Sequence, residues 1–206
     1  MKTQKIVYLS LLGDGNLIEA IKCFEKYQRQ LLTYSDADEE TQAIILKELN
    51  SSRNIFINRL NNLANMFMKK NEYTKASICL SEILQYRFKD FGCLMSYIIC
   101  LYNLKHSDLV DEFLDYLNTL ITDNINPLIF KDISKMYIKI DNIEQAAFYM
   151  EKYMKSTDEN KIGYEDYDLL GTFYCEIYMN KIKNPKYKDL QYILDSIDCF
   201  LKADEL

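Results

Sequence analysis

Residues 57–90 constrain the fold most, because they have the pattern of two amphipathic helices joined by a tight turn. An apolar stripe with spacings of three and four residues predicts the first helix: Leu60, Leu63, Ala64 and Phe67. Three polar residues then interrupt the stripe, and their centre is Asn71, a residue type that readily adopts positive φ. The stripe resumes at Tyr73, Ala76, Leu80, Ile83 and Leu84. The stretch therefore predicts a helix–turn–helix unit.

Other parts of the chain repeat this pattern. We place further units near 5–34, 91–124, 127–160 and 164–206, with turns at residues 13–16 and at Asp141-Asn142. Residues 35–56 interrupt the period, and form either one inserted helix or an N-terminal extension of the helix that carries Leu60. A connection through Asn184-Pro185 separates the last two helices. We expect residues 1–206 to form a single domain built from about ten or eleven helices.

These units resemble the tetratricopeptide repeat, a helix–turn–helix motif of about 34 residues. Ala64 and Ala76 stand where two helix axes have to approach closely. The resemblance implies an all-α fold, a right-handed solenoid in which each unit packs on its neighbours. Two units, 57–90 and 127–160, match the family well and three match it loosely. Asp195 and Asp198 predict a polar outer face for the closing helix, as a terminal repeat requires.

Composition argues against several kinds of site. The net charge of −6 disfavours nucleic acid as a partner, since phosphate binding needs clustered Lys and Arg. Six Cys without a CxxC pair and a single His, His106, offer almost no set of zinc ligands. We interpret the cysteines as small buried hydrophobes in a reducing compartment and His106 as an exposed turn residue. We expect a non-enzymatic, cytoplasmic protein without cofactor, metal or membrane insertion. A homodimer stays open.

Binding is better motivated than catalysis. In a tetratricopeptide stack the first helix of each unit lines a concave groove, and the resemblance implies that polar residues on this side hold a peptide. The candidate peptide-binding residues are Asn58, Asn61, Asn65, Tyr102, Lys131 and Lys135. Asn carries both a donor and an acceptor for a peptide backbone, and Lys would take a carboxylate. Met95 and Ile99 are expected on the same side, and the lysines have an alternative role in pairing with Glu165 and Asp168.

Three functions fit the sequence. The first is a protein-interaction scaffold that binds a peptide or protein segment in the groove. The second is a bacterial signalling-peptide receptor or regulator. The third is an accessory domain of a glycosyltransferase system, for which the motif Asp36-Ala37-Asp38 would matter. The same residues also suit a helix start, with Ser35 followed by Asp38 as an N-cap with acidic residues in the first turn, and no strand-like segment precedes them.

Overall fold

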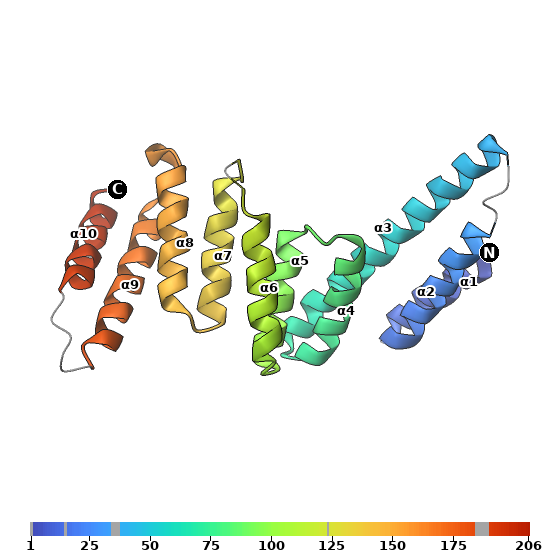
Figure 1. Cartoon of the computed structure of the whole chain (residues 1–206), viewed down its shortest axis with the longest axis horizontal. Coiled ribbons are helices and arrows are strands. Elements are labelled where there is room, and N and C mark those ends of the chain that lie inside the picture. The colour runs from blue at the N-terminus through green and yellow to red at the C-terminus, as the bar shows by residue number, and fades with distance from the viewer. Residues whose placement is uncertain (1, 15, 34–37, 123, 184–189) are drawn as a thin grey trace. The chain divides into compact units, whose positions relative to one another are not determined.

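The protein is all-α, as predicted. A computed structural model describes residues 2–14, 16–33, 38–122, 124–183 and 190–206. Within these ranges it contains ten α-helices, one short 3₁₀ turn and no strand (Figure 1). The chain divides into two compact units, residues 1–110 and 111–206. In both units, most helices that follow one another along the chain pack against each other.

The N-terminal unit contains five helices and the start of a sixth. They are α1 (Lys2–Gly13), α2 (Leu17–Leu32), α3 (Glu39–Lys69), α4 (Tyr73–Tyr86) and α5 (Phe91–Asn103). The bounds of α1 and α2 match the predicted 5–34 unit, and those of α3 and α4 place the predicted turn at residues 70–72. Residues 35–56 do not form a separate inserted helix. The described part of this segment is the N-terminal half of α3, so the extension is the correct alternative.

The N-terminus of α3 explains where this long helix begins. Asp38 is its N-cap, and the carboxylate accepts a 2.8 Å hydrogen bond from the backbone N–H of Thr41. This bond satisfies one of the donors that the first turn of a helix leaves free. It also lowers the pKa of Asp38. Ser35 and the other two residues of the Asp36-Ala37-Asp38 motif lie outside the described residues. A helix does start in this segment, but Asp38 is its N-cap rather than a residue of its first turn.

Three of the connections between successive helices contain the same turn. The residue after the helix end has positive φ in each case: Asn71 at 59°, Lys105 at 64° and Asp141 at 55°. The next backbone N–H donates to a carbonyl five residues earlier, in the bonds Glu72 to Phe67, His106 to Leu101 and Asn142 to Tyr137. This is the Schellman motif, which satisfies carbonyls that a helix end leaves free. The first helix of each of these connections therefore ends in the same way.

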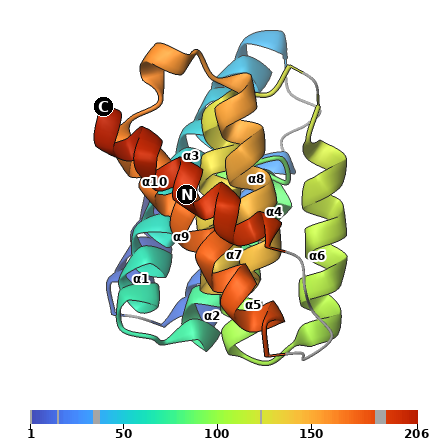
Figure 2. The ribbon, with the colours of Figure 1, turned by 90° about the vertical axis from the view of Figure 1, so that its left-hand side faces the viewer.

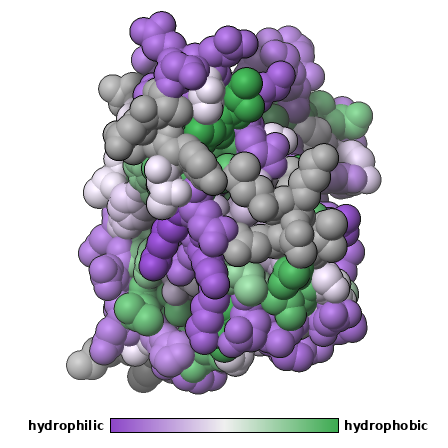
Figure 3. All heavy atoms as spheres, turned by 90° about the vertical axis from the view of Figure 1, so that its right-hand side faces the viewer, coloured by the Kyte–Doolittle hydropathy of each residue, from purple (hydrophilic) through white to green (hydrophobic). Residues whose placement is uncertain are grey.

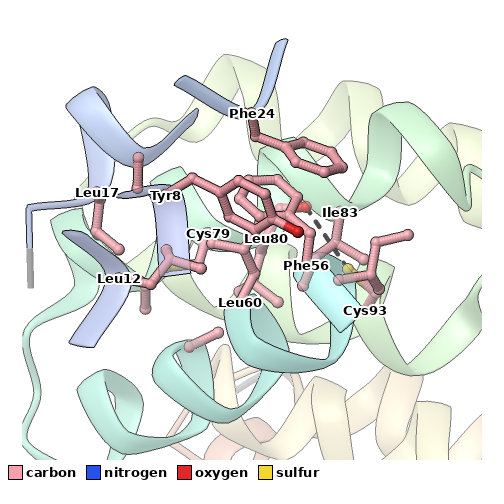
Figure 4. Packing of buried hydrophobic residues seen from close by; sticks show 14 of the residues in the cluster. Tyr8, Leu12, Leu17, Phe24, Phe56, Leu60, Cys79, Leu80, Ile83 and Cys93 are labelled. Atoms are coloured by element: carbon pink, nitrogen blue, oxygen red, sulfur yellow. Dashed lines mark hydrogen bonds between the residues drawn. The ribbon is translucent and has the colours of Figure 1, made fainter. Parts of the chain in front are cut away.

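The core of the N-terminal unit joins α1, α2, α3 and α4 (Figure 4). Phe24 and Phe56 stack with their ring centroids 3.9 Å apart, and Tyr8 meets the Phe24 ring edge-on at 4.9 Å. Ala64 and Ala76 are fully buried, as their small size predicts. On the surface that carries α1 and α2, hydrophilic side chains predominate outside the grey atoms, and the apolar ones form separate areas (Figure 3).

The C-terminal unit contains most of α6 (Ser107–Leu120) and four further α-helices. They are α7 (Pro127–Lys139), α8 (Ile143–Ser156), α9 (Tyr164–Lys181) and α10 (Gln191–Glu205), with the short turn η1 (Glu159–Lys161) before α9. Pro127 occupies the first turn of α7, where a missing N–H costs nothing. Gly171 permits a close approach of α9 and α10, since a Cβ there would lie 3.0 Å from the Phe200 ring. The predicted connection at Asn184-Pro185 lies outside the described residues.

Candidate functional site

The predicted asparagines lie on one face of α3 in the N-terminal unit. Asn58, Asn61 and Asn65 are exposed and are spaced by three and four residues, so they share a side of the helix. The structure extends this set with exposed asparagines that the sequence analysis did not single out: Asn50, Asn54 and Asn62. We call these six residues the asparagine row. At 1.5 Å per residue it covers about 22 Å of the helix.

Most of the asparagine row is available for intermolecular hydrogen bonds. Asn54 accepts a 3.3 Å bond from the Arg87 guanidinium. The other five side-chain amides make no hydrogen bond within the described part of the chain. Each amide offers two N–H donors and a carbonyl acceptor. The six asparagine side chains are therefore uncharged groups, most of them with unused donors and acceptors, and the Arg87 guanidinium adjoins them at Asn54.

The first helix of the third predicted unit, α5, exposes less of its candidate binding residues than expected. Tyr102 on α5 is half-buried, and the Lys105 ammonium lies 5.2 Å from its ring centroid. Met95 and Ile99, expected on the groove side of the same helix, are each only 8% exposed. Both side chains are thus buried and offer little surface to a ligand, and their position beside a groove stays a prediction.

The two candidate lysines have different surroundings in the C-terminal unit. The Lys131 ammonium on α7 is ion-paired with the buried carboxylate of Asp166 on α9, at 2.5 Å. Tyr153 on α8 donates a 3.3 Å hydrogen bond to the other oxygen of this carboxylate, and its ring centroid lies 5.1 Å from the Lys131 ammonium. Burial lowers the pKa of Lys131, but the hydrogen bond and charge of Asp166 outweigh it and leave that pKa raised.

Lys135 is exposed and has no ion pair among the described residues. Lysine pairing between neighbouring helices was one of the sequence alternatives, but the partner is Asp166 rather than Glu165 or Asp168. Lys131 therefore joins α7 to α9, whereas Lys135 has its charge free. The asparagines lie in one unit and the lysines in the other, and a shared binding surface stays a prediction.

A pocket of about 530 Å³ lies in the C-terminal unit between α8, α9, α10 and the η1 segment. Four carboxylates line it, from Glu151, Glu159, Asp195 and Asp198, together with two ammonium groups. The remaining wall is largely aromatic and apolar: Met154, Ile162, Tyr167, Leu170 and Tyr174. No part of this pocket was anticipated from the sequence, because its residues come from segments that are far apart along the chain.

Comparisons with known proteins leave the family open. No family model matches the sequence, and no curated protein matches it. Among solved structures, the chain is similar to one titled "Crystal structure of MamA protein", with 12% sequence identity and a TM-score of 0.47. This similarity covers 100% of the present chain and 96% of that one.

The outer face of α10 differs from the expectation. Leu190, Leu194, Ile197 and Leu201 are each at least half exposed, although a polar closing face was predicted. Asp195 and Asp198 lie beside these apolar residues, so they do not make the outer face polar. The prediction failed because apolar residues spaced three and four apart can form either a stripe that packs on another helix or a stripe that faces solvent. Ser196 and Cys199, on the opposite side of α10, are the positions buried against α9.

The remaining sequence candidates carry little chemistry in the structure. His106 is exposed in the turn before α6. Burial raises the pKa of the Cys79 and Cys93 thiols to about 12, so both are protonated at neutral pH. Within the described ranges, no three His, Cys, Asp or Glu side chains gather as a metal site would require. None of the helices there combines the length and the apolar character needed to cross a bilayer.

Proposed function

We propose that the chain is a non-catalytic protein-interaction scaffold of the tetratricopeptide type, acting as one repeat domain, and that it binds an extended peptide segment. The asparagine row is the observation that carries this proposal. Five of its six amides have no partner within the described residues. Neutral amides with unused donors and acceptors suit a ligand whose own groups are neutral and repeated. The backbone of an extended peptide has both properties.

The dimensions of the row support this proposal. Side chains three or four residues apart on a helix surface lie about 5–6 Å from each other. An extended peptide repeats its backbone groups on one side every 6.6–6.8 Å or so, which is two residues of about 3.3–3.4 Å. Flexible amides can span this small difference. Successive asparagines, beginning with Asn58, Asn61 and Asn65, would therefore bind successive N–H and C=O groups of the peptide.

The other candidate residues have secondary roles in this proposal. Tyr102 contributes an aromatic surface beside the peptide. Lys135 provides a free ammonium group for an acidic side chain or a terminal carboxylate. Lys131 contributes by fixing α7 against α9 through Asp166, because its charge is already neutralised there. Selectivity for acidic peptides would then depend on Lys135 and decrease with added salt.

The test starts from a random peptide library displayed on phage and panned against the immobilised full chain. Enriched peptides are synthesised, and their affinities are measured for the wild type and for the triple variant Asn58→Ala, Asn61→Ala and Asn65→Ala. Each lost hydrogen bond is worth roughly 0.5–1.5 kcal/mol, so the triple variant should bind about tenfold more weakly or worse. The control is Arg59→Ala with Met66→Ala, two exposed residues on another side of α3.

A second arm separates backbone recognition from side-chain recognition. Methylating alternate peptide nitrogens removes N–H donors and should abolish binding, whereas replacing individual peptide side chains with Ala should be tolerated. Affinity that survives N-methylation, or an equal loss in the triple variant and the control, would contradict the proposal. So would a library from which no peptide is enriched.

A further inference from the structure

The outer face of α10 is an unpartnered apolar seam. Leu190, Leu194, Ile197 and Leu201 follow one another at spacings of four, three and four residues, with exposures of 50–58%. This is the spacing of a two-heptad a/d stripe, which packs against another helix in coiled coils. In Figure 2, α10 lies toward the viewer, in front of the other described helices of the C-terminal unit. We call these four residues the α10 seam.

Acidic groups surround the seam. Asp195 and Asp198 lie along one side of it and also line the pocket described above. Asp204 and Glu205 follow at the end of the helix and are exposed. Lys202 is the basic residue of α10, and its ammonium is engaged by Asp198 at 2.8 Å. Along α10 itself, the charged residues beside the seam therefore carry a net negative charge.

The adjoining pocket has carboxylates without a cation. Lys155 pairs with Glu151 at 2.9 Å, and Tyr174 donates a 2.8 Å hydrogen bond to the other oxygen of that carboxylate. Glu159 and Asp195 have no ion pair among the described residues. The buried hydroxyl of Thr157, also in the pocket wall, has no hydrogen-bond partner there. The pocket thus offers an unused hydroxyl and two carboxylates without a counter-ion above an apolar wall, and one of these carboxylates, Asp195, accepts a 2.7 Å hydrogen bond from the Gln191 amide.

We propose that the α10 seam and this pocket form one docking surface for an amphipathic helix with Lys or Arg beside its apolar stripe. The apolar stripe of the partner packs on Leu194 and its neighbours, and a long basic side chain enters the pocket. There its aliphatic stem meets Met154 and Leu170, and its charge meets Glu159 and Asp195. This surface is separate from the asparagine row, and the proposal does not rest on peptide binding there.

Charge favours this occupant over a second copy of the chain. Two α10 seams facing each other would bring the exposed Asp204 and Glu205 of both copies toward one interface, and like charges across an interface oppose association. A basic helix instead gains attraction from the same groups. A membrane surface is disfavoured for the same reason, because common anionic lipids repel acidic residues.

The experiment uses the full chain and two synthetic helical peptides of equal length. Both peptides have Leu at the a and d positions, and they carry either Lys or Glu at the flanking e and g positions. Fluorescence anisotropy should show binding of the Lys peptide and none of the Glu peptide. Leu194→Gln with Leu201→Gln should weaken binding of the Lys peptide by about tenfold or more per leucine. Glu159→Gln with Asp195→Asn should weaken it too and reduce its dependence on salt.

Ile44→Gln with Leu46→Gln provides the matched control, because both residues are exposed hydrophobics on α3, far from α10 in the sequence. These substitutions should leave binding of the Lys peptide unchanged. Circular dichroism should show that every variant has the helix content of the wild type. Equal binding of both peptides, or equal losses in the control and the seam variant, would overturn the proposal. Sedimentation should give a monomer; a dimer that dissociates in the seam variant would assign the seam to a second copy instead.

Discussion

The hydroxyl of Ser134 on α7 donates a 2.8 Å hydrogen bond to the backbone carbonyl of Ala146 on α8, and both residues are buried. The next pair of helices repeats this arrangement, because Ser196 on α10 donates a 2.8 Å bond to the carbonyl of Gly171 on α9. In both cases a small residue lets the helices approach, and a hydroxyl on one helix reaches the backbone of the other.

Ser134→Ala tests the contribution of this bond. The Ala146 carbonyl also faces its own helix, so the loss should be that of one hydrogen bond, about 1 kcal/mol of unfolding free energy. Urea denaturation of the wild type and the variant measures this loss as a lower midpoint with an unchanged slope. Ser51→Ala, at an exposed position of α3, is the control and should leave the midpoint nearly unchanged. Identical midpoints for Ser134→Ala and the wild type would show that the bond adds nothing.

Lys131→Met should be far more destabilising than Lys135→Met. Removing the Lys131 ammonium leaves the buried Asp166 carboxylate without its counter-ion, at a cost of roughly 3–5 kcal/mol. Lys135 is exposed and unpaired among the described residues, so its replacement should change stability by less than about 0.5 kcal/mol. Adding Asp166→Asn to Lys131→Met should restore much of the loss, as thermal unfolding would show. Similar melting temperatures for the two single variants would contradict this assignment.

Glu82→Gln should stabilise the protein at neutral pH. Glu82 is 4% exposed, and burial raises the pKa of its carboxyl, with the charge of Glu25 acting in the same direction and a hydrogen bond to Tyr86 acting against it. Since this pKa is higher in the folded than in the unfolded chain, ionised Glu82 opposes folding above the unfolded pKa. The cost should diminish as the pH falls through the folded pKa. Below about pH 4 the carboxyl is protonated in both states, and the cost is absent.

Unfolding midpoints of the wild type and Glu82→Gln across this pH range measure the effect. The free energy of unfolding of the variant at pH 7 should be higher by roughly 1 kcal/mol or more. This is the typical cost of burying one polar group without a hydrogen-bond partner. The difference should shrink as the pH is lowered. A constant difference would indicate that ionisation of Glu82 is not responsible.

Ala76→Leu should destabilise the pairing of α3 and α4. Ala76 is fully buried, so the added side chain must displace neighbours at a cost of roughly 1–3 kcal/mol. Thr74→Leu adds a similar side chain at an exposed position of α4 and should have little effect. Equal denaturation midpoints for the two variants would show that Ala76 is not needed for close packing.

The sequence predicted the helix pairs well because their signals are local. The stripe that contains Ala64 and the polar residues around Asn71 were sufficient to place the helices and the turn. Which face of a helix is covered depends on residues far away in the chain, and no local pattern encodes it. The ion pair of Lys131 with Asp166 joins two residues that are 35 positions apart in the sequence and lie on different helices. For the same reason, the leucines of α10 could not be distinguished from core residues by their spacing.

The asparagine row was found in part. Asn58, Asn61 and Asn65 were identified because they fall within a clear repeat unit. Asn50 and Asn54 were missed because residues 35–56 could be taken for a separate helix with its own orientation. A continuous α3 fixes the direction of these side chains relative to Asn58, which only the structure established.

Because α3 is unbroken, the direction in which each asparagine of the row points depends on its rotation about the helix axis. Successive residues of an α-helix are rotated by 100°, so one residue inserted between Asn54 and Asn58 would turn Asn50 and Asn54 away from the other four. An insertion of seven residues would return them almost to the original direction, at the cost of a longer row. The first helix pair, which contacts the N-terminal half of α3, would rotate with it. The length of this helix thus sets which way the first pair faces relative to the asparagines.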